Sequence, residues 1–166
     1  MKVDAYVHFI VKSAGEIPEE GGYICYENSI FDPSEFTEIV HCKPRKSWKF
    51  GEEIVDHINN KDFVNTARSS TWLSERITGV GDDVYQIIDK LLDMFEPHVD
   101  GLIAFSKKYN VYYEIEFILY KVGLDSSGLF LDSRCIEFCH KTGTEIAIQT
   151  MLAGDEGFDL DYKSFS

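Results

Sequence analysis

The sequence predicts an α+β fold in which a mostly antiparallel sheet carries helices on one face. Three stretches, 3–12, 111–122 and 145–152, are rich in the β-branched and aromatic residues typical of strands, and helical patterns lie between them. The segment 31–42 also returns in a degraded form 99 positions later. A strand–helix–strand unit is therefore expected twice, in the ferredoxin-like arrangement. The identities in this repeat are Phe31 with Phe130, Ser34 with Ser133, Glu38 with Glu137 and His41 with His140.

The first unit begins with the stretch 3–12, whose two faces are both largely apolar, as is typical of a central strand. The next element is a helix, expected to begin after Asp32 because aspartate is a favoured N-cap residue and Glu35 completes a capping-box spacing. Pro44 is expected to end this helix, since proline cannot continue the hydrogen-bond ladder. A short strand over 45–50 then closes the first unit.

The middle of the chain carries a long helical pattern over 82–109, with a break or restart at Pro97. Two segments precede it. The polar segment 52–66 predicts an irregular excursion, and 69–77 predicts a strand. A second copy of the short helix is expected over 132–141, after the strongest strand pattern of the chain.

The length of 166 residues suits one domain with its own core. We expect a single α+β domain over 1–153 and an acidic, aromatic tail over 154–166, which is either an interaction segment or a disordered terminus. The chain has no apolar run of the ~20 residues that span a bilayer, and its first residues lack the unbroken apolar core of a signal peptide. A cytoplasmic location is therefore expected.

The formal net charge of −13 argues against nucleic acid or an anionic membrane as the partner, because both require a basic face. A basic protein would be attracted to such a surface. The alternative is that the acidic residues only maintain solubility.

No motif of a catalytic or cofactor site is present, and no cofactor is expected. Cysteine and histidine recur in the two short helices, so a zinc site is conceivable if these helices are neighbours. The favoured interpretation is structural, since the spacing places Cys135 and Cys139 on the apolar stripe of their helix. A catalytic cysteine is disfavoured because no local signature surrounds any of them.

Glu114 and Glu116 share one side of a predicted strand, because side chains two positions apart point to the same face. Two aligned carboxylates can shift each other's pKa and perform acid–base chemistry. The alternative is a solvated sheet face.

Five features occur along the chain in a characteristic order: Asp32-Pro33, Pro44, Lys49-Phe50-Gly51, Ser70-Thr71-Trp72-Leu73 and a long helix leading into a strand over 91–122. In these features the chain resembles a family of bacterial domains of unknown function, DUF4279, over residues 3–152. The resemblance implies the fold and supplies no catalytic residues. Some family members resemble toxin-immunity proteins, which would imply an inhibitory role.

The leading hypothesis is a non-enzymatic, cytoplasmic protein-binding module, in its sharpest form an immunity-type inhibitor of a basic toxin such as a nuclease. Its acids would replace the phosphates of the toxin's substrate. The predicted partner-binding residues are the acids of the excursion and the acids and aromatics of the tail: Glu52, Glu53, Asp56, Asp155, Glu156, Phe158, Asp159, Asp161 and Tyr162.

Two other functions remain open. The chain could bind a small molecule or act as an enzyme through a pocket between sheet and helices, lined by Trp48, Trp72 and tyrosines. A pocket in which polar groups such as Glu114 or His8 converge would favour that function. A homodimer with an apolar sheet face is the third possibility.

Overall fold

The computed structural model describes residues 2–58, 61–122, 129–153 and 158–159. The fold is α+β, as predicted, with a mixed six-stranded sheet in the order β11-β10-β2-β8-β5, and β9 pairs with β2 beyond the end of β8. Its strands are β2 (Ala5–Ser13), β5 (Lys46–Trp48), β8 (Thr71–Leu73), β9 (Ile77–Gly79), β10 (Val111–Val122) and β11 (Glu145–Ala153).

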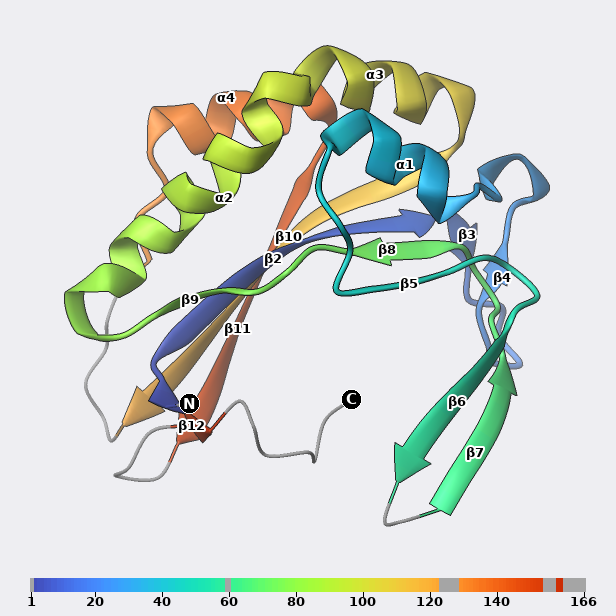
Figure 1. Cartoon of the computed structure of the whole chain (residues 1–166), viewed down its shortest axis with the longest axis horizontal. Helices are drawn as coiled ribbons and strands as arrows, with labels where there is room; N and C mark the ends of the chain where they lie inside the picture. The colour runs from blue at the N-terminus through green and yellow to red at the C-terminus, as the bar shows by residue number, and fades with distance from the viewer. Residues whose placement is uncertain (1, 59–60, 123–128, 154–157, 160–166) are drawn as a thin grey trace.

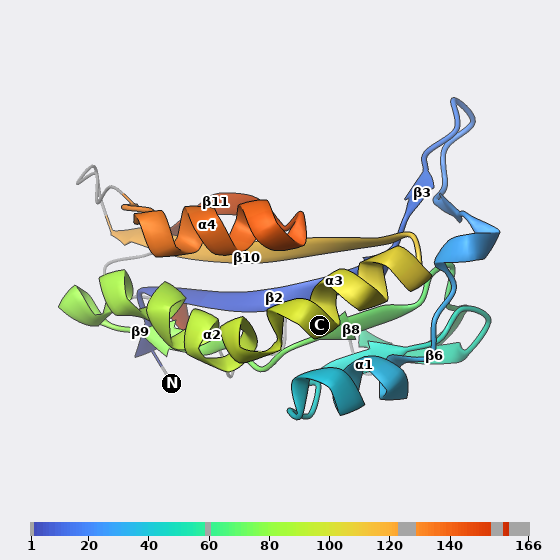
Figure 2. The same ribbon diagram turned by 90° about the horizontal axis from the view of Figure 1, so that it is seen from above.

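The four α-helices of the described residues lie on one face of this sheet (Figures 1 and 2). They are α1 (Pro33–Val40), α2 (Ile87–Phe95), α3 (Val99–Lys108) and α4 (Ser133–Thr142), and three 3-10 helices accompany them, η1 (Glu27–Ser29), η2 (Gly81–Gln86) and η3 (Glu96–His98). Three further strand pairs lie outside the main sheet: β1 (Lys2–Val3) with β12 (Phe158–Asp159), β3 (Gly15–Glu16) with β4 (Ile24–Cys25), and β6 (Glu53–Ile58) with β7 (Lys61–Thr66).

The two strand–helix–strand units are not equivalent, so the expected ferredoxin-like repeat is not confirmed. In the second unit β10 and β11 are parallel neighbours joined through α4. In the first unit β2 and β5 are separated by β8, which is antiparallel to both. The matched sequence segments thus form similar helices within different sheet connections.

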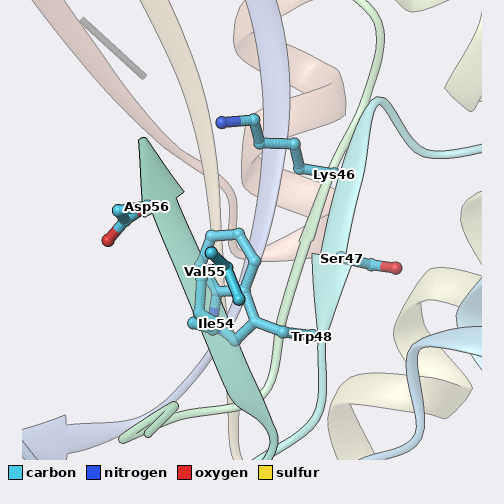
Figure 3. Close-up of a pocket in the computed structure, with 6 residues that line it drawn as sticks. All are labelled: Lys46, Ser47, Trp48, Ile54, Val55 and Asp56. Atoms are coloured by element: carbon cyan, nitrogen blue, oxygen red, sulfur yellow. The ribbon is translucent and has the colours of Figure 1, made fainter. Parts of the chain in front are cut away.

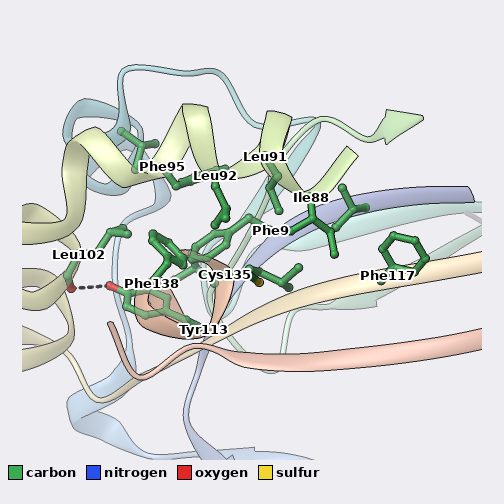
Figure 4. Close-up of a cluster of buried hydrophobic side chains, with 14 of the residues drawn as sticks. Phe9, Ile88, Leu91, Leu92, Phe95, Leu102, Tyr113, Phe117, Cys135 and Phe138 are labelled. Atoms are coloured by element: carbon green, nitrogen blue, oxygen red, sulfur yellow. Dashed lines mark hydrogen bonds between the residues drawn. The ribbon is translucent and has the colours of Figure 1, made fainter. Parts of the chain in front are cut away.

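The core lies between the sheet and the helices and is centred on Phe9 of β2 (Figure 4). Its ring lies 4.4 Å from the ring of Phe95 and 5.6 Å from that of Tyr113, measured between centroids. Trp72 of β8 is fully buried and donates a hydrogen bond of 3.0 Å from its indole nitrogen to the Thr37 hydroxyl of α1. Aromatic rings from the sheet and the helices therefore pack against each other, and the buried indole N–H of Trp72 has a hydrogen-bond acceptor.

The N-cap of α1 is Asp32, as predicted, and its carboxylate accepts a 2.9 Å hydrogen bond from the Ser34 amide. The prediction of a capping box was wrong. The Glu35 carboxylate does not turn back to the Asp32 amide but binds Lys108 and Tyr109 at the end of α3, at 2.5 and 2.7 Å. The helix also ends before Pro44, at His41, whose left-handed backbone (φ 53°) terminates it.

The predicted long helix consists of α2 and α3 joined by η3, which contains Pro97, so the break at this proline is confirmed. Within the described part of the chain, no helix has the length and apolar character needed to cross a membrane.

The N-cap of α4 is Asp132, whose carboxylate accepts a 2.9 Å hydrogen bond from the Cys135 amide. We expect Asp132→Ala to lower the free energy of unfolding by about 1 kcal/mol, because this amide would lose its acceptor. Urea denaturation would measure the change. Asp132→Ser, which retains a capping oxygen, is the matched control and should stay near the wild-type value; equal losses in both variants would contradict a capping role.

Two predicted elements differ from the structure. The segment 52–66 is not irregular, because it contains the β6–β7 hairpin, with Val55 directly opposite Val64. The predicted strand 69–77 is divided into β8 and the start of β9, since residues 74–76 interrupt the pairing with β2.

Candidate functional site

The helix-free face of the sheet carries a group of polar side chains at its centre. The β2–β10 register places His8 directly opposite Glu116, and Tyr6 lies two residues before His8 on the same face of β2. Arg76, just before β9, lies with its guanidinium carbon 4.4 Å from the centroid of the Tyr6 ring. We call Tyr6, His8, Arg45, Arg76 and Glu116 the sheet-face cluster.

His8 and Glu116 form the centre of this cluster. The Nε2 atom of His8 lies 2.5 Å from the Glu116 carboxylate, and the side chain of His8 is only 5% exposed. The second carboxylate oxygen of Glu116 accepts a 3.0 Å hydrogen bond from the Gln149 amide of β11. The hydrogen bond from His8 lowers the pKa of Glu116, and the positive charges of Arg76 and Arg45 contribute in the same direction.

Arg45 lies immediately before β5, where its backbone amide donates a 2.8 Å hydrogen bond to the carbonyl of Leu73. Burial lowers the pKa of Arg45, and the nearby charge of Arg76 lowers it further. Burial raises the pKa of Tyr6, although both arginines act against this shift. Arg76 is therefore placed by its contact with the Tyr6 ring, and Arg45 acts on Arg76, Tyr6 and Glu116 through its charge.

Three buried nitrogen atoms of this cluster have no hydrogen-bond partner: Nδ1 of His8, Nε of Arg45 and Nε of Arg76. They are the only such side-chain atoms among the residues that the structure describes. Since buried polar groups are normally satisfied, three such atoms in one cluster make it a candidate site.

Glu114 and Glu116 do share a face of β10, as predicted, but they do not form an acid–base pair. The Tyr112 hydroxyl donates to both Glu114 and Glu145, at 2.7 and 2.9 Å. Glu116 is bound to His8 instead, and its pKa is lowered, the opposite of what repulsion between two carboxylates would produce.

The second candidate surface is the β6–β7 hairpin, which projects from the sheet (Figure 1). Every residue of β7 is exposed. Three exposed side chains of the hairpin are apolar. Val55 of β6 is 49% exposed, and Phe63 and Val64 of β7 are 47% and 60% exposed. The cross-strand register places Val55 and Val64 on one face of the hairpin and Phe63 on the other.

The predicted acids of 52–66 gather at this hairpin. Glu52 precedes β6 and accepts a hydrogen bond from the Lys49 amide at 3.0 Å. Glu53 is exposed at the start of β6, and Asp56 accepts a 3.3 Å hydrogen bond from the Asn65 side chain across the hairpin. We call these acids, together with Val55, Phe63 and Val64, the hairpin surface.

Two of the predicted residues of the tail lie in the described part of the chain. Phe158 and Asp159 form β12, which pairs with β1. The other four, Asp155, Glu156, Asp161 and Tyr162, lie outside the described residues.

A cleft of about 400 Å³ lies between β5 and β6, lined by Trp48, Lys46 and Ser47 on one side and by Ile54, Val55 and Asp56 on the other (Figure 3). This cleft does not lie between sheet and helices, where the pocket lined by Trp48 and Trp72 was predicted. Trp72 lies in the core with no exposed surface, so only Trp48 of the two tryptophans lines the cleft.

The cysteines of α4 face the core, as expected. Cys135 is 1% exposed, and Cys139 packs half-buried against the same cluster. The hydrogen bond with Cys139 and burial raise the pKa of Cys135, which disfavours its reactive thiolate. No group of three metal-binding side chains comes together in the part of the chain that is described.

Fold and surfaces together define a class: an α+β domain with helices on one side of a mixed sheet, a polar cluster on the other side, and a projecting hairpin. The chain belongs to the family described as "Domain of unknown function (DUF4279)", whose sequence model matches residues 23–153. This match includes α1 to α4, the hairpin and the two arginines of the sheet-face cluster. Searches of curated proteins and of solved structures found no match.

Proposed function

We propose that the chain is a non-enzymatic, cytoplasmic protein-binding module that docks a basic protein partner through the hairpin surface. In its sharpest form it is an immunity-type inhibitor that neutralises a basic toxin. The observation that carries this proposal is the exposure of Val55, Phe63 and Val64 on a hairpin that also bears acidic side chains.

Apolar exposure of this kind is costly for a free protein. A two-stranded hairpin without further strands is at best marginally stable, and β6 and β7 pair only with each other in the described part of the chain. A partner that covers Val55 and Val64 would bury apolar surface at the centre of the contact, where hot-spot residues concentrate.

The charge of the hairpin favours a basic partner. Glu52, Glu53, Asp56 and Asp62 are acidic, whereas Lys61 is the only lysine or arginine between residues 52 and 66. These charges add to a chain with a net charge of −13, so a basic surface would be steered toward the hairpin by long-range attraction.

The test begins with capture of partners by the tagged chain from the cells that make it, followed by kinetics with the purified partner. Glu53→Lys should slow association at low salt by about tenfold, because steering acts mainly on the association rate. Val64→Ser should mainly speed dissociation, because it removes a buried apolar contact. Stopped-flow mixing or surface-based kinetics would measure both rates.

Glu19→Lys is the matched control, since Glu19 is an exposed acid in the turn between β3 and β4 and the change in net charge is the same. If Glu19→Lys and Glu53→Lys slow association equally, total charge is responsible and the hairpin is not the docking site. If the Val64→Ser variant dissociates from the partner at the wild-type rate, Val64 makes no buried apolar contact with the partner.

The cleft between β5 and β6 favours small-molecule binding as a second candidate function. Its volume of about 400 Å³ is within the range of ligand sites. Trp48 supplies an aromatic surface and Lys46 a positive charge at this site.

A further inference from the structure

We propose that the sheet-face cluster is a binding site for an anionic oxygen group, a carboxylate or a phosphate, held by Arg45 and Arg76. This site is separate from the hairpin surface and is independent of the function proposed above.

Neither arginine is paired with a carboxylate in the part of the chain that the structure describes. Among the described residues, neither guanidinium makes a side-chain hydrogen bond or an ion pair, and the Nε atom of each is buried. The chain has 29 acidic residues, so this lack of a bound carboxylate is unexpected. The other two arginines behave differently: Arg134 binds Asp93 and Glu96, both at 2.6 Å, and Arg68 is exposed to solvent.

The nearby acids do not fill the vacant donor positions. Both carboxylate oxygens of Glu116 are engaged, one by His8 and the other by Gln149. Glu75 acts on Arg45 only through its charge and is itself exposed. Among the described residues, the guanidinium groups therefore keep hydrogen-bond donors that no side chain occupies.

The remaining residues of the cluster hold the arginines in place. Arg76 lies over the Tyr6 ring, a cation–π contact that holds the guanidinium group at this side of the sheet. Tyr6 in turn contacts His8 edge-on, with ring centroids 5.7 Å apart, and His8 is anchored by Glu116.

The ligand class follows from the donors. A guanidinium group presents a planar fork of N–H donors that matches two oxygens of a carboxylate or phosphate. Two such forks in partly buried surroundings would bind either group more strongly than exposed lysines do, because burial reduces the screening of charge.

The four arginines of the chain allow a direct test by NMR on the ¹⁵N-labelled full chain. Each arginine gives one Nε–Hε signal, and Arg45→Lys and Arg76→Lys assign the two signals of the cluster. Inorganic phosphate and succinate are titrated in separate samples, each compared with sodium chloride at the same ionic strength. We expect the signals of Arg45 and Arg76 to move saturably with at least one anion, while those of Arg68 and Arg134 stay in place.

The comparison of phosphate with succinate shows which group the site prefers. Arg76→Gln and, in a second variant, Arg45→Gln should each weaken binding by about tenfold or more, whereas Arg68→Gln, the matched control, should bind like the wild type. Circular dichroism in the near ultraviolet confirms that each variant is folded. The proposal is overturned if no signal saturates with either anion, if all four signals move alike, or if a folded Arg76→Gln variant binds with unchanged affinity.

Discussion

Phe9→Ala is expected to lower the free energy of unfolding by about 3–5 kcal/mol, the usual cost of removing a large aromatic side chain from a packed core. Phe9 has no exposed surface, and its ring contacts those of Phe95, Tyr113 and Phe138, which come from α2, β10 and α4. The cavity would therefore lie where three elements meet, and no single neighbour could fill it. Urea denaturation followed by tryptophan fluorescence measures the change.

Phe130→Ala is the matched control for this prediction. Phe130 is 80% exposed, so its truncation should change the free energy of unfolding by less than about 0.5 kcal/mol. A loss below about 1 kcal/mol for Phe9→Ala would contradict the view that the core is centred on Phe9.

The second large effect is expected at Glu116. The pKa of this carboxyl lies below the ordinary value of 4.5, chiefly because of the hydrogen bond from His8. A lowered folded-state pKa means that the ionised group stabilises the fold above about pH 4.5, and that this contribution is lost as the pH falls through the folded-state pKa. Glu116→Gln should therefore lower the free energy of unfolding by about 2 kcal/mol at pH 7, the scale of a charged hydrogen bond.

The pH dependence distinguishes this effect from a simple packing defect. The difference in unfolding free energy between wild type and Glu116→Gln should be constant above about pH 4.5 and should shrink as the pH is lowered below that value, because the carboxyl then becomes protonated. Glu38→Gln, at an exposed position of α1, removes the same charge and should show little difference at any pH. A Glu116→Gln difference that stays constant with pH would exclude the electrostatic explanation.

The elements with strong periodicity could be predicted from the sequence. The strands β2, β10 and β11 and the helix α4 appeared where apolar residues alternate or recur at helical spacing. The matched positions Phe36 and Cys135 are both buried, at 0% and 1% exposure. The hairpin β6–β7 was missed because neither of its faces is buried, so its sequence shows no clean alternation of apolar and polar residues.

The sheet-face cluster could be predicted only in part. Glu114 and Glu116 were placed on one face by their spacing, and His8 was named as a residue that would converge on a pocket. Arg45 and Arg76 were missed, because their approach depends on how β5, β8 and β9 are ordered beside β2. The interruption at residues 74–76, which brings Arg76 over Tyr6, leaves no local signal in the sequence.

The pairing of β2 with β10 has a consequence for how the chain folds during synthesis. His8 and Glu116 are 108 positions apart, so the centre of the sheet forms only after most of the chain has left the ribosome. Until then β2 has no β10 beside it, and its apolar residues stay open to unwanted association. Contacts of such long sequence separation also slow folding, since the loop must close before they stabilise the fold. We therefore expect the nascent chain to depend on chaperones more than its modest size suggests.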